Sequence, residues 1–194
     1  MPHPQPASRN PRSSRRLIVL IGLLAVAAVA AGLIWCNNRL PREFAAVQPG
    51  VLYRCAQPTP SQLKKAVADY GVKTILIARE PSSDRVAAEL EAAENLDLHV
   101  EQIPLVSRMP ISDEHVRRFF EIVDDPANQP VLVHCSQGRH RTGYLCGLYR
   151  IERQGWTLAQ AVEELESFCA DEDDTHVMVT LLRQYRPRGE GKEE

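Results

Sequence analysis

The sequence predicts an α/β fold, with a central mixed sheet flanked by helices and preceded by one N-terminal transmembrane helix. From residue 51 onward, short β-rich runs alternate with amphipathic stretches, which is typical of α/β domains. Before them, residues 17–35 form an uncharged, almost wholly apolar run about as long as a membrane-crossing helix. A chain of 194 residues has room for one ordinary domain plus such a segment.

The N-terminal region is predicted to be a membrane anchor. Residues 1–16 are rich in Pro, Ser and Arg and are expected to form a disordered basic tail, and 36–49 are expected to be a linker. Four arginines precede the apolar run and two closely follow it, which places the N-terminus in the cytoplasm and the domain outside. A cleavable signal peptide is the alternative, but its apolar region is usually about 7 to 15 residues long.

The predicted domain covers residues 50–186, and a polar, disordered tail follows at 187–194. Strands are predicted at 51–54, 73–78, 98–103 and 130–134. Helices are predicted at 59–70, 85–95, 112–123, 142–153, 157–168 and 175–185. Gly71 and Gly155 mark two helix ends, and Ser112 or Asp113 begins the third helix.

Composition excludes several classes of function. The net charge of −2 is too balanced for a strongly basic nucleic-acid-binding protein. The cysteines show no C-x-x-C spacing and their number is odd, which argues against a zinc site and a complete disulfide framework. The acidic run at 171–174 lacks the alternating ligands and central glycine of an EF-hand. No metal or other cofactor is expected.

A candidate anion-binding loop runs from His134 to Gly143. The predicted strand before it is apolar, and the predicted helix after it starts near Thr142. At such a strand–loop–helix junction the backbone N–H groups converge, and the helix N-terminus adds partial positive charge, so a phosphate is well accommodated. The candidate substrate-binding residues are Ser136, Gln137, Gly138, Arg139, His140 and Arg141.

Catalytic roles within this loop follow from side-chain chemistry. The field that favours phosphate also favours the thiolate of Cys135, which is a nucleophile in that form. Arg141 can bind two phosphoryl oxygens at once and follow the charge into the transition state. Thr142 can donate its hydroxyl to the sulfur when the sulfur leaves, and His134 is expected to orient the loop by hydrogen bonding.

The loop resembles that of the cysteine-based protein tyrosine phosphatase superfamily, H-C-x5-R-[S/T], and matches every fixed position. The resemblance extends from about residue 50 to 168 and is greatest to the atypical dual-specificity phosphatases of plants and fungi and their bacterial relatives. It includes 51–54 (VLYR), Gln57-Pro58 and the loop pattern C-x-x-G-x-H-R-T-G. It implies a phosphatase that forms a phosphocysteine intermediate. Rhodanese-type sulfurtransferases hold their cysteine in a shorter loop.

The resemblance also implies a general acid, and here the sequence departs from the usual pattern. Residues 105–108 follow a strand end where ordinary dual-specificity enzymes carry an aspartate, yet they contain no carboxylate. In the atypical branch an aspartate lies 22 residues before the cysteine, and Asp113 matches that spacing. Asp113 is therefore the provisional acid, and stabilisation of a helix N-terminus is its alternative role.

The substrate is predicted to be a phosphorylated protein or an inositol phosphate. Arg139 and His140 add positive character that suits a highly charged substrate. A catalytically idle module that only binds phosphorylated partners is the alternative from another class of function.

Cys55 stands where the relatives carry a small hydroxyl residue, so a reversible disulfide with Cys135 is a further hypothesis, with simple packing as its alternative. Arg79 either lines the pocket or is a surface residue.

Overall fold

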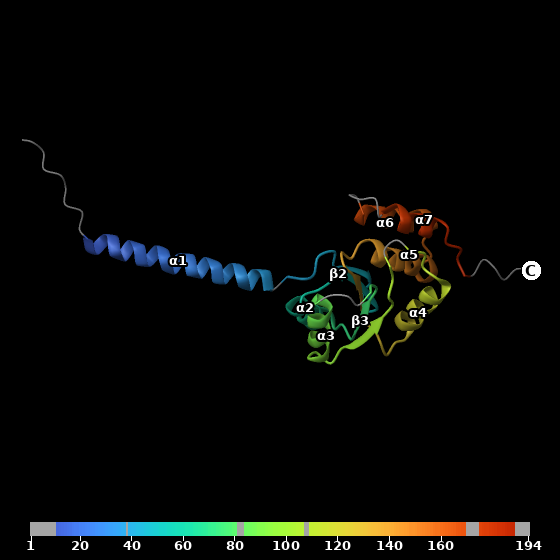
Figure 1. Ribbon diagram of the computed structural model, residues 1–194, viewed down its shortest axis with the longest axis horizontal. Helices are drawn as coiled ribbons and strands as arrows, with labels where there is room; N and C mark the ends of the chain where they lie inside the picture. The colour runs from blue at the N-terminus through green and yellow to red at the C-terminus, as the bar shows by residue number, and fades with distance from the viewer. Residues whose placement is uncertain (1–10, 38, 81–83, 107–108, 170–174, 189–194) are drawn as a thin grey trace, which may run out of the picture. The chain divides into compact units, whose positions relative to one another are not determined.

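The computed structural model describes residues 11–37, 39–80, 84–106, 109–169 and 175–188 (Figure 1). The chain divides into two compact units, Met1–Arg39 and Leu40–Glu194. The predicted tails at 1–16 and 187–194 lie mostly outside the described residues, as does the acidic run at 171–174.

The first unit contains helix α1, Pro11–Asn37. It begins six residues before the predicted start at 17, because proline at the first helical position and the arginines after it are compatible with a helix. Its described apolar side chains, among them Val19, Leu23 and Val26, are exposed. None of the helices within the described residues combines the length and the apolar character that a membrane crossing requires, so the predicted span is not supported there. The side chains of 17, 18 and 33–35 lie outside the described residues.

The second unit is built on a five-stranded mixed sheet in the order β1-β2-β5-β3-β4. Its strands are β1 (Ala45–Gln48), β2 (Leu52–Ala56), β3 (Thr74–Ile77), β4 (His99–Gln102) and β5 (Val131–Cys135). All neighbouring strands pair in parallel except β1, which pairs with β2 antiparallel. β5 therefore lies in the middle of the sheet, between β2 and β3.

Strand β1 lies inside the segment predicted as a linker, 36–49. The prediction missed it because four residues, Ala45–Gln48, give too short a pattern to recognise as a strand. Pairing with β2 stabilises it, and Val47 is buried in the core. The compact unit thus starts about ten residues before the predicted boundary at residue 50.

The helices of this unit are α2 (Pro60–Tyr70), α3 (Asp84–Glu94), α4 (Asp113–Asp124), α5 (His140–Gln154), α6 (Leu158–Phe168) and α7 (Thr175–Arg183). Capping boxes begin α2, α4 and α6, at Thr59, Ser112 and Thr157. Gly71 and Gly155 end α2 and α5 in the left-handed conformation, as their positions in the sequence predicted. The predicted strands and helices after residue 50 are all present within a few residues, which confirms the α/β prediction.

The side chains of the sheet alternate between two hydrophobic layers. In β5, Val131 and Val133 pack with α4, α5, α6 and α7, whereas Leu132 packs with α2 and α3. Figure 1 shows these two groups of helices on opposite sides of the strands. Burial of both faces explains why every residue of β5 is buried.

Candidate active site

The candidate site lies where the parallel strands end. Cys135 is the last residue of β5, and its register partner in β2 is Ala56, at the end of that strand. Backbone hydrogen bonds continue the pairing past the ends of β2 and β3, the two strands that flank β5. Gln57 N–H donates to Ser136 O (3.2 Å), and Ala78 N–H donates to His134 O (2.7 Å). Ligands of α/β sheets bind at the carboxyl ends of the strands, so the fold places the predicted loop at such a position.

Gly138 fixes the path of the loop. Its φ of +72° belongs to the left-handed region, which other residues rarely adopt. A Cβ at this position would come within 2.4 Å of the backbone of Cys55 and Ala56. The loop therefore passes directly over the end of β2, and only glycine fits there.

A buried arginine supports the loop from below. Arg54 in β2 is 2% exposed, and its Nη2 donates to Gly138 O at 2.7 Å. Its guanidinium lies 3.6 Å from the centre of the Phe168 ring. The Nε and Nη1 atoms have no hydrogen-bond partner within the described residues. A buried cation held this way places positive charge directly beneath the anion-binding loop.

Cys135 is itself almost fully buried, at 2% exposure. Burial raises the pKa of its thiol, but hydrogen bonds from the Thr142 hydroxyl and backbone N–H, the charge of Arg141 and the Gly138 N–H together lower it below its ordinary value. No other donor or acceptor in the described part of the chain pairs with the buried Thr142 hydroxyl. The loop thus favours the thiolate, the nucleophilic form.

Arg141 and Thr142 lie in the first turn of α5, which begins at His140. Helix N-terminal N–H groups and the helix dipole are therefore available to an anion in the loop. Arg141 is half-buried, and its Nη1 donates to Leu105 O at 2.9 Å. This contact places the guanidinium against the segment that follows Ile103, where ordinary dual-specificity enzymes carry an aspartate and this chain carries no carboxylate.

His134 belongs to a buried polar chain behind the loop. Its Nδ1 lies 3.0 Å from Cys135 O, and its Nε2 lies 2.7 Å from Glu89 Oε1 in α3. Gln57 Nε2 donates to the other oxygen of Glu89 at 2.8 Å, and Arg79 Nη1 donates to Gln57 Oε1 at 2.8 Å. His134 and Glu89 are 0% and 1% exposed. Arg79 is therefore hydrogen-bonded to this chain of side chains, and it is not among the residues that line the cavity described below.

Asp113 is the first residue of α4, after the N-cap Ser112, and its side chain is exposed. Burial, and secondarily the charge of Asp113, raises the pKa of Tyr144 in α5 to about 12. Tyr144 lies one turn after Arg141, so the Asp113 carboxylate lies near the start of α5. No hydrogen bond joins Asp113 to the loop within the described residues. Both of its predicted roles, general acid and helix-terminus residue, are compatible with this position.

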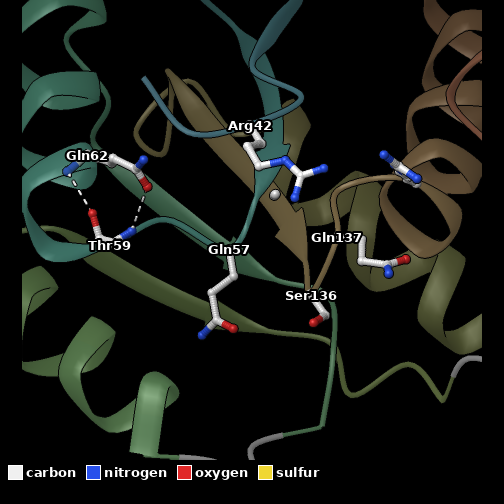
Figure 2. A pocket seen from close by; sticks show the side chains of 8 residues that line it. Arg42, Gln57, Thr59, Gln62, Ser136 and Gln137 are labelled. Atoms are coloured by element: carbon white, nitrogen blue, oxygen red, sulfur yellow. Dashed lines mark hydrogen bonds between the residues drawn. The ribbon is translucent and has the colours of Figure 1, made fainter. Parts of the chain in front are cut away.

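A cavity of about 350 Å³ borders the loop on the side of β2 (Figure 2). Its lining residues are Arg42, Ala56, Gln57, Thr59, Gln62, Ser136, Gln137 and Arg139. Three of the predicted substrate-binding residues, Ser136, Gln137 and Arg139, line this cavity. His140 does not line it, because it is buried in the first turn of α5. Arg139 is half-buried, and its Nε lies 3.3 Å from Glu43 Oε1.

Cys55 and Cys135 are both free thiols. The register places Cys55 opposite His134 rather than Cys135, and successive residues of a strand point to opposite faces. Cys55 accordingly packs in the layer of α2 and α3, and burial raises the pKa of its thiol. The hypothesis of a Cys55–Cys135 disulfide is therefore not supported, and the packing alternative describes Cys55.

Sequence reasoning missed the roles of Arg54, Glu89 and Arg42. Arg54 was visible as a charged residue inside an otherwise apolar strand, 52–56. Glu89 lies three residues from both the buried Val86 and the buried Ala92, so it stands in the apolar stripe of α3. Arg42 had no recognisable signal, because its place beside the loop depends on the antiparallel pairing of β1.

Proteins of other organisms match this chain over the same region. An inositol diphosphatase of Arabidopsis thaliana, DSP4, is 31% identical over 134 residues, which cover 67% of this chain and 65% of that protein. The match thus spans just under two thirds of that relative's length. It agrees with the predicted resemblance to the atypical dual-specificity branch.

Solved structures share the fold. The core catalytic domain of the PP-IP phosphatase SIW14 from S. cerevisiae, in complex with citrate, has a TM-score of 0.66 and 26% identity, covering 76% of this chain and 88% of that chain. A cysteine-to-serine variant of P. aeruginosa TpbA, in complex with pTyr, has a TM-score of 0.59 and 26% identity, covering 75% and 91%. A sequence profile described as "Tyrosine phosphatase family" matches residues 40–187, well over half of the chain. The chain therefore belongs to the tyrosine phosphatase family and is a phosphatase of the cysteine-based type.

Proposed function

We propose that this phosphatase hydrolyses phosphate monoesters through a phosphocysteine intermediate, with Cys135 as the nucleophile and Arg141 as the phosphate-binding residue. The observation that carries the proposal is the environment of the Cys135 sulfur. Donors from Thr142 and Gly138 and the charge of Arg141 converge on it and lower its pKa despite its burial. A cysteine with only a structural role has no use for these donors.

The reaction proceeds in two displacements. The Cys135 thiolate attacks phosphorus, an S–P bond forms, and the P–O bond to the leaving group breaks while Asp113 protonates the leaving oxygen. Water then attacks phosphorus while the Asp113 carboxylate accepts its proton, the S–P bond breaks, and inorganic phosphate and the thiolate are released. Arg141 and the N–H groups of the loop stabilise the transferring group in both steps, and the Thr142 hydroxyl stabilises the departing sulfur.

Replacing Cys135 with Ser tests the mechanism. We expect Cys135→Ser to abolish turnover of phenyl phosphate while inorganic phosphate still binds, and we expect the wild-type rate to be unaffected by a metal chelator. Asp113→Asn separates the two roles of that residue, because a general acid affects the rate with poor leaving groups most. Turnover by the serine variant at the wild-type rate is incompatible with the proposal.

Inositol (poly)phosphate hydrolysis is the second candidate function. It is supported by the arginines beside the loop, Arg42 and Arg139, and by two similar proteins whose names specify inositol diphosphatase or PP-IP phosphatase activity. The pTyr complex of TpbA supports phosphotyrosine instead. Side-by-side values of kcat/KM for a phosphotyrosine peptide and inositol phosphates decide between them. A module that only binds phosphorylated partners would turn over neither.

We further propose that residues 17–35 hold the protein in a membrane, with the N-terminus in the cytoplasm and the catalytic domain on the other side. The proposal is supported by the absence of charge in 17–35, by the exposed apolar side chains of α1, and by the excess of arginine before this segment. Carbonate extraction of membranes tests attachment, and release of the full chain into the supernatant contradicts it. A reporter fused after Glu194 tests sidedness.

A further inference from the structure

The cavity beside the loop contains an arginine that the reaction does not use. Arg42 is exposed, and within the described residues its guanidinium makes no hydrogen bond or ion pair. Figure 2 shows this guanidinium directed into the space among Gln57, Ser136 and Gln137. The remaining charged group of the lining, Arg139, is paired with Glu43. Arg42 therefore contributes an uncompensated positive charge.

Backbone geometry holds Arg42 at a fixed place relative to the nucleophile. The N–H of Ala56 donates to Arg42 O at 2.7 Å, and Ala56 is the register partner of Cys135. Two strand spacings, about 10 Å, thus separate the backbones of Arg42 and Cys135. The cavity between them is bounded by Ser136 and Gln137, which belong to the loop itself.

The lining suits an anion rather than an aromatic ring. Ala56 is the only apolar residue among those that line the cavity, and no carboxylate is among them. Thr59 and Gln62 are held by their mutual capping box, and Gln57 is held by Glu89 and Arg79. Arg42, Ser136 and Gln137 are thus the groups available to a ligand.

We propose that this cavity is a second phosphoryl subsite, in which Arg42 binds one phosphate group while the scissile phosphate of the same molecule occupies the loop. The inference rests on the proposed function of the loop and names its substrate class: small molecules with several phosphate groups, such as inositol polyphosphates. A phosphotyrosine residue carries a single phosphate, so it leaves the subsite empty. Arg42 is then a specificity-determining residue.

The test compares two substrates in the full chain. Arg42→Met removes the charge at similar length, and Lys64→Met is the matched control, since Lys64 is an exposed cation of α2 that does not line the cavity. We expect Arg42→Met to lower kcat/KM for inositol hexakisphosphate at least ten times more than kcat/KM for phenyl phosphate, mainly through KM. Arg42→Lys should lie in between, because lysine keeps the charge but not the two-pronged contact. Lys64→Met should leave the ratio unchanged.

A binding measurement tests the subsite without relying on turnover. In a Cys135→Ser background, inositol hexakisphosphate should bind at least tenfold more tightly with Arg42 than with Met at that position, whereas inorganic phosphate should show a much smaller difference. Equal losses for both ligands, or no loss for either, overturn the subsite. If the wild-type chain hydrolyses neither substrate, the proposed function fails, and the binding result still decides the subsite.

Discussion

Two opposing effects act on the Cys135 sulfur. Burial raises its pKa, and the donors of Thr142 and Gly138 with the charge of Arg141 lower it further than burial raises it. The other described thiols lack this balance, and burial raises the pKa of Cys146 to about 11. At neutral pH the thiolate population is therefore concentrated at Cys135.

Replacing Thr142 with Val should move this titration. Because the folded protein lowers the pKa of Cys135, the thiolate persists below the ordinary pKa of a thiol, and its reactivity is lost as pH falls through the lowered value. Thr142→Val removes the hydroxyl donor, so the acidic limb of the rate of alkylation by iodoacetamide should move to higher pH. Cys135→Ser should remove that phase altogether. An unchanged pH profile in Thr142→Val would show that the hydroxyl does not act on the sulfur.

Gly138→Ala should damage both stability and activity. The left-handed φ costs a non-glycine residue about 1 to 2 kcal/mol, and the contact of the new Cβ with the backbone of β2 adds to this. We expect a loss of more than about 2 kcal/mol in the free energy of unfolding and at least a hundredfold loss in kcat/KM. Gly155→Ala is the matched control: its φ is +68°, but no atom lies within 4 Å of the added Cβ. It should lose about 1 kcal/mol and keep its activity.

At the scale of elements, two segments distant in sequence hold the loop. Strand β2 supplies Arg54 beneath Gly138, and helix α3 supplies Glu89 behind His134. Both side chains are ionisable and buried, so each depends on the partners it contacts. The loop is thus positioned by the packing of β2 and α3 as well as by its own sequence.

Glu89→Ala should destabilise the protein by about 3 kcal/mol, because it leaves His134 and Gln57 buried without their partner. Glu89→Gln keeps the shape of the side chain and should lower the free energy of unfolding by less. Urea unfolding measures both, and kcat for phenyl phosphate reports whether the loop moves. Glu91→Ala, an exposed change in the same helix, is the control and should change the free energy of unfolding by less than about 0.5 kcal/mol. A loss in Glu89→Ala as small as this would mean that the buried chain does not stabilise the fold.

At the scale of the whole molecule, all the described residues of the candidate site belong to the unit Leu40–Glu194. Strand β1 is an integral part of that unit. Val47 is buried, and its carbonyl accepts from Arg150 Nη1 at 2.8 Å and from Gln154 Nε2 at 3.0 Å. Tyr149 OH donates to Gln48 Oε1 at 2.7 Å. These contacts tie β1 to α5, the helix that starts at the loop.

Two truncations should therefore behave differently. We expect residues 40–194 to hydrolyse phenyl phosphate with the kcat of the full chain. A fragment of residues 50–194 lacks β1 and should be at least about 3 kcal/mol less stable, because it loses the burial of Val47 and several hydrogen bonds. Thermal unfolding and kcat measured on the two fragments check this. Equal stability of the two fragments would show that the domain begins at residue 50, as the sequence predicted, and that β1 is not needed for its stability.

The sequence by itself determined the alternation of strands and helices, the helix ends at Gly71 and Gly155, and the loop from His134 to Gly143. These features depend on local periodicity, on caps and on residues adjacent along the chain, all of which a sequence shows directly. The sequence did not predict β1, because its four residues give too short a pattern to recognise as a strand.

Only the tertiary structure decided which distant residues meet at the loop. Arg54 reaches Gly138 across 84 positions, Glu89 reaches His134 from another helix, and Arg42 borders Ser136 because β1 pairs with β2. Sheet order and register create these contacts, and neither can be derived from the spacing of residues along the chain. The same register separated Cys55 from Cys135, since two residues one step apart on paired strands face opposite sides of the sheet.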